Sequence, residues 1–322
     1  MASRCIFERN MKPTSRAVAR VLVAAAVLAA GVAAGRAQSG YVPVRVYDSH
    51  AKRFADFETL ASAAAKADVV FVGEQHDDVN SHRLELALLE ALRRRRGDVV
   101  LALEMFERDV QEPLLHFSMG HIDESEFLAQ ARPWPQYARD YKPLVDFAIA
   151  HDWAVVAADV PRTIAADVAR SGLDALKGRP DAEKNWFARD LQCEPKGDYF
   201  DRFREAMTGH DASAPALDAA AMARYYASQC LKDETMAESI AQAYAAGSIG
   251  GKRPLVVSIN GTFHSDYGDG TVERTRRRLP GKRVLVVTMI PAGDLDAIAP
   301  DKDTRARADW IVYSTKETGS PR

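Results

Sequence analysis

Short, nearly continuous runs of apolar residues alternate with longer helical stretches along this chain, and this alternation constrains the fold more than any other feature. Such runs are typical of strands that are covered on both faces. Strands separated by helices predict βαβ units around a parallel sheet. We therefore expect an α/β fold with a mostly parallel central sheet flanked by helices. The predicted strands are residues 69–72, 99–103, 154–158, 255–259 and 284–288, and the predicted helices are residues 57–67, 81–95, 141–151, 163–170 and 272–279.

The segment from about residue 180 to residue 247 breaks this alternation. It has no strand signal, it is rich in alanine and charge, and residues 217–246 carry apolar side chains at helical spacing. We expect a helical insertion of two to four helices between the third and fourth core strands, with residues 211–218 as an exposed linker. With 322 residues, 47% of them hydrophobic, the chain is long enough for one domain that carries such an insertion.

The first 37 residues have the pattern of a secretory signal peptide. Arg16 and Arg20 precede the apolar stretch VLVAAAVLAAGVAA, which at 14 residues is short for a membrane span, and residues 35–37 offer a small-residue cleavage site. We expect the mature domain to cover residues 38–322 and to be periplasmic or secreted. Because Cys5 lies ahead of the apolar stretch and no cysteine directly follows it, we expect no lipid anchor.

Cleavage makes the protein more acidic. The leader holds six basic side chains and one acidic side chain, so its removal takes the net charge from −2 to −7. A net acidic exported protein is a poor candidate for binding nucleic acid. Two cysteines remain, Cys193 and Cys230; an isolated pair in an oxidising compartment favours a disulfide, with two buried thiols as the alternative.

Polar residues follow each of the first four predicted strands. In an open parallel sheet, ligands bind beyond the carboxyl ends of the strands, so these side chains are expected on one rim. They are Glu74 and His76, then Glu104, then Asp159, then Asn260 and His264.

Each of these residues also has a structural interpretation. Gly73 and Gly261 would let the chain turn sharply as it leaves a strand, and a single histidine at a strand end is more often a hydrogen-bonded structural residue. Two Gly-x-x-His elements in equivalent positions, ending at His76 and His264, favour a shared site instead. They meet if the first and fourth core strands are neighbours in the sheet.

Five stretches carry a further signal, and together they span most of residues 68–291: VVFVGEQHDDVNSH, LALEMFERDVQ, YKPLVDFAIAHDWAVVAADVPR, LKDETMAESIA and VVSINGTFHSDYGDG. In this order they resemble the ChaN-type haem-binding uptake proteins of the Tiki-like superfamily. The resemblance implies an α/β fold with a helical insertion and a periplasmic or surface protein linked to haem and iron uptake. Better-known relatives are lipoproteins, and this chain departs from them because it lacks the anchoring cysteine.

The superfamily also contains Tiki-type metalloproteases, in which paired Gly-x-x-His elements and a glutamate form the implied metal site. On that pattern the metal ligands here are His76, His264 and Glu104, with Glu74 as a further candidate. A hydrolase of this type would hold a divalent ion such as Mn²⁺ or Zn²⁺ with an open position for water.

A haem binder needs an iron ligand and an apolar slot. The candidate ligands are His76, Tyr267, Tyr141 and Met105, and Trp134 and Phe106 could line the slot. Haem binding without catalysis is the first interpretation, metal-dependent hydrolysis the alternative, and an interaction protein with a vestigial rim the third. Under the haem-binding interpretation, an outer-membrane haem uptake system is a candidate partner and a homodimer is a candidate assembly.

Overall fold

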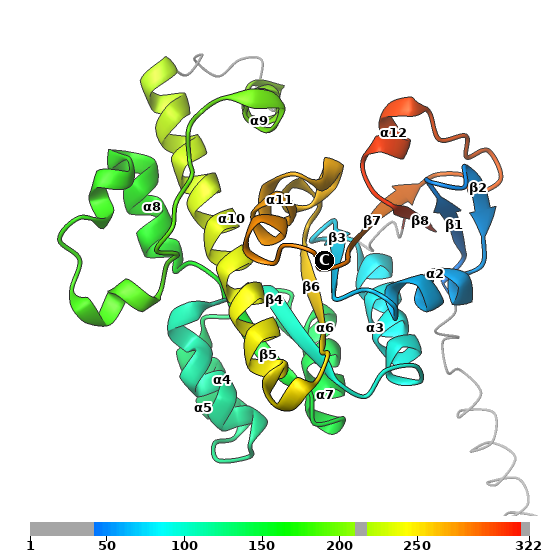
Figure 1. Cartoon of the computed structure of the whole chain (residues 1–322), viewed down its shortest axis with the longest axis horizontal. Coiled ribbons are helices and arrows are strands. Elements are labelled where there is room, and N and C mark those ends of the chain that lie inside the picture. The colour runs from blue at the N-terminus through cyan, green and yellow to red at the C-terminus, as the bar shows by residue number, and fades with distance from the viewer. Residues whose placement is uncertain (1–41, 210–217, 317–322) are drawn as a thin grey trace, which may run out of the picture. The chain divides into compact units, whose positions relative to one another are not determined.

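The computed structural model describes residues 42–209 and 218–316. The expected signal peptide and nearly all of the expected linker at residues 211–218 lie outside these residues, so both stay expectations. The described residues form one eight-stranded sheet with helices on both faces (Figure 1).

The sheet has the strand order β2-β1-β8-β7-β3-β6-β4-β5. The six strands from β8 to β5 run parallel, whereas β1 pairs antiparallel with both β2 and β8. The mostly parallel sheet is therefore confirmed, and three strands at one edge were not predicted. The strands are β1 (Val44–Asp48), β2 (Arg53–Ala55), β3 (Val69–Glu74), β4 (Val99–Glu107), β5 (Ala154–Asp159), β6 (Leu255–Gly261), β7 (Val284–Ala292) and β8 (Trp310–Thr315).

All five predicted helices are present, with shifts of up to three residues at their ends. None of the helices in the described part of the chain is long and apolar enough to cross a membrane. The α-helices are α2 (Phe57–Ala64), α3 (Val79–Arg93), α4 (Gln111–Ser118), α5 (Glu124–Ala131), α6 (Tyr137–Asp140), α7 (Lys142–Ala150), α8 (Arg162–Ser171), α9 (Gly197–Gly209), α10 (Ala219–Gly247), α11 (Gly270–Arg278) and α12 (Lys302–Ala306).

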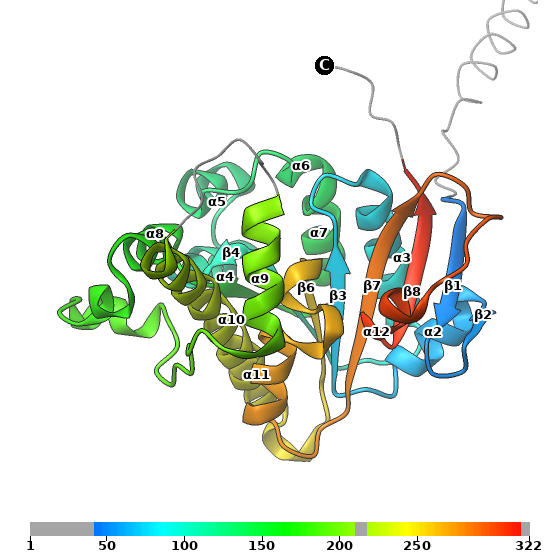
Figure 2. The same cartoon turned by 90° about the horizontal axis from the view of Figure 1, so that it is seen from above.

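Alternate residues of each core strand face opposite sides of the sheet and enter two different cores. In β3, Val70 and Val72 pack with side chains of α3 and α7, whereas Val69 and Phe71 pack with side chains of α10 and α11. Figure 2 shows α10 and α11 on one side of the sheet and α3 and α7 on the other. A strand that is buried on both faces has no polar face, which explains the continuous apolar runs in the sequence.

Strand β6 lies between β3 and β4. The register pairs Glu74 with Gly261 across β3 and β6, and Leu103 with Ile259 across β4 and β6. The first and fourth core strands are thus neighbours, as the shared-site prediction requires, and the second lies on the other side of the fourth. Three strand ends open side by side at the same rim.

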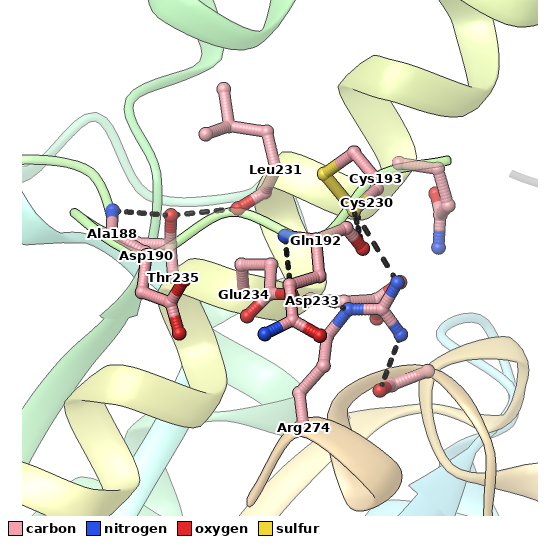
Figure 3. The surroundings of a disulfide bond; sticks show 12 residues. Ala188, Asp190, Gln192, Cys193, Cys230, Leu231, Asp233, Glu234, Thr235 and Arg274 are labelled. Carbon is pink, nitrogen blue, oxygen red and sulfur yellow. Dashed lines mark hydrogen bonds and ion pairs between the residues drawn. A yellow bond between two sulfur atoms is a disulfide. The ribbon is translucent and has the colours of Figure 1, made fainter. Parts of the chain in front are cut away.

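The expected insertion consists mainly of α9 and α10, which lie between β5 and β6 in the chain. A disulfide joins Cys193, in the loop before α9, to Cys230 of α10, which confirms the disulfide prediction (Figure 3). Arg274 of α11 reaches toward the same bond, with Nη2 3.3 Å from Cys230 Sγ. The bond spans a sequence separation of 37 residues and fastens the loop before α9 to the helix that covers the sheet.

Candidate functional site

The rim beyond β3, β6 and β4 holds two buried glutamates that lie on opposite faces of the sheet. Glu74 has the same orientation in β3 as Val70 and Val72 and therefore faces α3 and α7. Glu104 follows the orientation of Ala102 in β4 and faces α10 and α11. The predicted site residues are thus distributed over two faces of the sheet. His76 lies in the loop between β3 and α3.

His76 is held from one side and open on the other. Its Nδ1 lies 2.6 Å from Glu74 Oε1, its ring meets the edge of the Trp134 ring with centroids 4.7 Å apart, and its side chain is 41% exposed. Burial disfavours the imidazolium, but the charges of Glu74 and Glu104 outweigh this and raise the pKa of His76. The carboxylate therefore fixes Nδ1 as the hydrogen-bond donor and leaves Nε2 as the nitrogen that can meet a ligand.

Gly261 and Gly73 serve close packing rather than a sharp turn, which corrects the expectation from the sequence. Neither has a positive φ. A Cβ at Gly261 would lie 2.8 Å from His76 Nε2, and one at Gly73 would lie 2.7 Å from Ser265 Oγ. The first glycine thus makes room for the imidazole, and the second lets the loop after β6 pack against β3.

On the α10 face, Glu104 and His264 form a buried pair. His264 Nε2 lies 3.3 Å from Glu104 Oε1, His264 Nδ1 donates to Asp233 Oδ1 at 2.7 Å, and the Gly261 N–H donates to Glu104 Oε2 at 2.7 Å. Burial opposes charge on both partners, yet their attraction lowers the pKa of Glu104 to about 2, and with Asp233 it raises that of His264 to about 10. The imidazolium form of His264 is therefore held between two carboxylates.

Beside this pair, Asp159 at the end of β5 faces Lys232 of α10, with Oδ2 3.5 Å from Nζ. Burial raises the pKa of Asp159 to about 6, and the nearby charge of Glu104 acts in the same direction. The charge of Asp159 in turn raises the pKa of Lys232. The third predicted strand end therefore belongs to the same charged cluster as Glu104.

Sequence reasoning missed the contributions of α10 to this cluster. Asp233 accepts hydrogen bonds from Tyr199, Thr271 and His264, and Gln229 Nε2 lies 3.2 Å from His264 Nδ1. Both residues lie on a helix whose charges could equally face solvent. The signal that could have found Asp233 is the stretch LKDET, where three charged residues interrupt a helix with an apolar stripe.

On the opposite face, Glu74 is the centre of a second buried cluster. The Tyr141 hydroxyl donates to Glu74 Oε1 at 2.7 Å, and His82 Nδ1 lies 3.1 Å from Glu74 Oε2 and 3.1 Å from Glu85 Oε2. Burial raises the pKa of Glu85 well above its usual value, and the charge of Glu74 adds to this. His82 and Glu85 were not among the predicted site residues because both lie inside the helix α3.

A pocket of about 330 Å³ lies where the rim meets α9. His76, His264 and Gln229 line its polar side, and Phe203 and Met207 of α9 belong to its apolar wall. Met207 is 38% exposed although it is a large apolar residue. The pocket thus combines imidazoles at one side with an apolar wall at the other, which suits a flat and largely apolar ligand with a metal centre.

The structure brings some of the expected ligands to this pocket and places others elsewhere. Tyr141 is fully buried with its hydroxyl on Glu74, and Met105 is buried in the core. Tyr267 lines a different pocket together with Arg305 and Arg307, and its hydroxyl donates to Asp303 Oδ2 at 3.0 Å. Phe106 is also in the core, whereas Trp134 lies against His76. A tyrosine or methionine ligand to iron is therefore not presented at this pocket by these residues.

Of the expected metal trio, Glu104 and His264 form the buried pair on the α10 face, and His76 lines the same pocket as His264. Within residues 42–209 and 218–316, the group of three side chains whose ligand atoms all lie within 4.8 Å of one another is Glu74, His82 and Glu85. The metal trio stays a prediction. Glu74, which lies on the same rim, belongs to the tighter group.

Comparison with known proteins shows the family and the fold of this chain. Residues 60–275 match the family described as "Haem-binding uptake, Tiki superfamily, ChaN". A solved structure described as cofacial haem binding to ChaN of Campylobacter jejuni is similar with a TM-score of 0.64 at 16% identity, over 84% of this chain and 97% of that one. Protein RETICULATA-RELATED 5, chloroplastic, of Arabidopsis thaliana is 28% identical over 241 residues, which cover 70% of this chain. The chain spans about a third of that plant protein, 31% of its length.

Proposed function

This chain belongs to the haem-binding uptake family of the Tiki superfamily, typified by ChaN, and we propose that it binds haem in the pocket beside His76. One observation carries the proposal: an imidazole that is fixed by a buried carboxylate borders a pocket with an apolar wall. The ligand is haem, and His76 is its iron ligand.

The contact between Glu74 and His76 is the kind of support that metal-binding histidines have. A ligating histidine usually donates its second ring N–H to a carboxylate or carbonyl, which fixes the tautomer and makes the ligating nitrogen more basic. In this chain Nδ1 makes that bond at 2.6 Å and Nε2 is the nitrogen that remains. Glu74 is itself held by the Tyr141 hydroxyl at 2.7 Å, so the imidazole has a fixed direction.

The apolar wall suits the macrocycle. Phe203, Ala206 and Met207 come from successive turns of α9 and line the pocket opposite the histidines. The volume of about 330 Å³ lies at the lower end of the range for small-molecule sites, about 300 to 1,000 Å³. One part of a haem would fill the pocket and the rest would extend over the rim, which supports a homodimer or a second haem as the cover of the exposed face.

A hemin titration followed by the Soret band tests this function. The wild-type protein is expected to saturate at a simple stoichiometry, and His76→Ala is expected to weaken binding without a change in melting temperature, because a residue at a sheet rim contributes little to the core. The matched control is His116→Ala, since His116 is an imidazole on α4 that lies outside the pocket. If His76→Ala binds hemin normally but melts early, the histidine is structural and the proposed ligand is wrong.

Metal-dependent hydrolysis is the second candidate, and the buried pair of Glu104 and His264 favours it. A carboxylate and an imidazole 3.3 Å apart, next to a second histidine, are the residue types that hold Zn²⁺ or Mn²⁺. The same protein samples decide between the candidates. No Soret response, together with a Mn²⁺ or Zn²⁺ ion that is lost in both His76→Ala and His264→Ala, would replace haem binding by this function.

Export and a role in iron uptake complete the proposal. Both rest on the leader pattern of residues 1–37 and on the family. Mass spectrometry of the protein purified from its own cells is expected to find an N-terminus near Gln38 in the periplasmic or secreted fraction. An intact leader in the cytoplasmic fraction would contradict export without affecting the haem proposal.

A further inference from the structure

The cluster around His82 lies in the core beneath the rim, on the face of the sheet that Glu104 does not reach. It consists of Glu74 from β3 and of His82 and Glu85 from α3, and all three side chains are at most 4% exposed. Two carboxylates that face each other in an apolar core require a positive partner or protons. The function proposed above assigns a role to Glu74 alone.

The orientation of His82 directs its Nδ1 at both carboxylates. Its Nε2 lies 3.2 Å from the backbone carbonyl oxygen of His76, which fixes Nε2 as the donor. Nδ1 then faces Glu74 Oε2 at 3.1 Å and Glu85 Oε2 at 3.1 Å. A neutral imidazole would present a lone pair to two carboxylate oxygens, so something positive must lie among these three atoms.

Two of the three distances among these atoms match the coordination shell of a small divalent ion, and ligand atoms of the three residues all lie within 4.8 Å of one another. Nitrogen and oxygen ligands at about 2.1 Å from such an ion stand about 3.0 to 3.4 Å apart in octahedral or tetrahedral geometry. The two distances of 3.1 Å from His82 Nδ1 fall in that interval. The bond from Nε2 to a backbone carbonyl is also the usual outer support of a ligating histidine.

A second observation points to a ligand independently of the spacing. Glu85 is 0% exposed, and its Oε1 has no hydrogen-bond partner among the described residues. Glu74 Oε2 makes no hydrogen bond there either, and its contact is the ion pair with His82 Nδ1. Buried carboxylate oxygens are almost always paired, because an unpaired one keeps its full desolvation cost. The unpaired oxygen of Glu85 belongs to the cluster that surrounds His82 Nδ1.

We propose that Glu74, His82 and Glu85 form a buried binding site for one divalent cation, separate from the haem pocket. One imidazole nitrogen and two carboxylates suit Mn²⁺, Fe²⁺ or Zn²⁺. The charges then balance, since a dication with two carboxylates and a neutral histidine sums to zero. Without the metal, a proton on His82 and a proton on Glu85 bring the net charge of the three side chains to zero.

Glu74 would then serve both sites with different oxygens. Oε1 accepts from Tyr141 and holds His76, whereas Oε2 faces His82. The ion would fix the carboxylate that orients His76. Glu74 also lines the haem pocket, whereas His82 and Glu85 do not, so the metal site stands without the haem proposal. His82 and Glu85 lie entirely below the rim.

Metal counting on the purified full chain tests the site. The protein is stripped with EDTA, dialysed against Mn²⁺ or Zn²⁺, and analysed by mass spectrometry for ions per chain. We expect one retained ion in the wild type and in His264→Ala, and an affinity that is weaker by about 10- to 100-fold or more in the isosteric variant Glu85→Gln. Glu85→Gln should keep the Soret response to hemin, which separates this proposal from the haem site.

Electron paramagnetic resonance and X-ray absorption of the metal-loaded wild type keep the test decisive if Glu85→Gln fails to fold. One imidazole nitrogen among oxygen ligands is the expected shell. Two imidazoles in the shell, or loss of the ion in His264→Ala, would place the metal at His76 and His264 and overturn the proposal. A wild type that retains no ion would show that the cluster holds only protons and would overturn it as well.

Discussion

Replacing Gly261 by alanine should weaken haem binding by displacing a side chain that is not mutated. The added Cβ would lie 2.8 Å from His76 Nε2 and 2.9 Å from Cε1. An ordinary contact begins near 3.4 Å, so the ring must retreat by about 0.6 Å. The backbone of Gly261 cannot move instead, because its N–H donates to Glu104 and its strand lies between β3 and β4.

The retreat strains the bond between His76 Nδ1 and Glu74 Oε1, which is 2.6 Å long. A hydrogen bond to a charged group contributes about 1.5 to 3 kcal/mol. Its loss from the bound state therefore corresponds to an affinity for hemin that is weaker by about 10- to 150-fold. Soret titration with hemin measures this change. Circular dichroism and thermal melting verify that Gly261→Ala keeps the fold.

Two control variants test whether Gly261→Ala acts through His76. Gly97→Ala is the same chemical change at a position where an added Cβ meets no atom within 4 Å, so it should leave hemin affinity unchanged. The double variant with His76→Ala should bind no more weakly than His76→Ala alone, because the clashing ring is gone. An equal further loss from Gly261→Ala in that background would show that the glycine acts through something other than His76.

Three further predictions concern the disulfide, the rim and a second pocket. Replacing Cys193 and Cys230 by serine should lower the unfolding free energy by about 4 kcal/mol, as measured by chemical denaturation, because the bond closes a separation of 37 residues; an unchanged midpoint would contradict this. Burial raises the pKa of Asp159 to about 6 from 3.8, so the folded state binds its proton more tightly than the unfolded state and stability falls as the pH rises through this interval. Relative to Asp159→Asn, the free energy of unfolding of the wild type should fall by up to about 3 kcal/mol between pH 4 and pH 7, as measured by urea titrations. A difference in unfolding free energy between the two proteins that stays constant with pH would show that Asp159 has a normal pKa. Tyr267→Phe should leave the hemin titration unchanged because Tyr267 lines another pocket, and a weakened Soret response would restore it as a ligand.

The core of the sheet could be predicted because its strands are buried on both faces. Five continuous apolar runs became β3 to β7 in the structure. The edge strands were missed for a physical reason. In β1, which reads VRVYD, charged residues interrupt the apolar run, and β1 joins β2 antiparallel with no helix between them. These two strands do not fit the rhythm of βαβ units on which the prediction depended, whereas β8 follows α12 and pairs parallel with β7.

The meeting of polar residues at one rim could be predicted as far as strand order allows. Neighbouring strands bring Glu104 and His264 to one rim, and this follows from the topology. The residues of the helices could not be found in the same way. His82 and Glu85 on α3, like Asp233 on α10, lie next to apolar residues in the chain whether they face the core or solvent. Only the packing of helix against sheet decides which face a polar side chain occupies.

The position of β6 has a consequence for the order of events during folding. Its residues, Leu255–Gly261, are made after about four fifths of the chain, yet they insert between β3 and β4. Until then β4 lacks a neighbour on one edge and β3 on both, because β7 is made later still, and unpaired parallel edges invite pairing with other chains. Contacts between such distant segments form slowly. The rim formed by the ends of β3, β6 and β4 is therefore completed only after β6 has been inserted, and until then the unpaired edges need to be shielded from other chains.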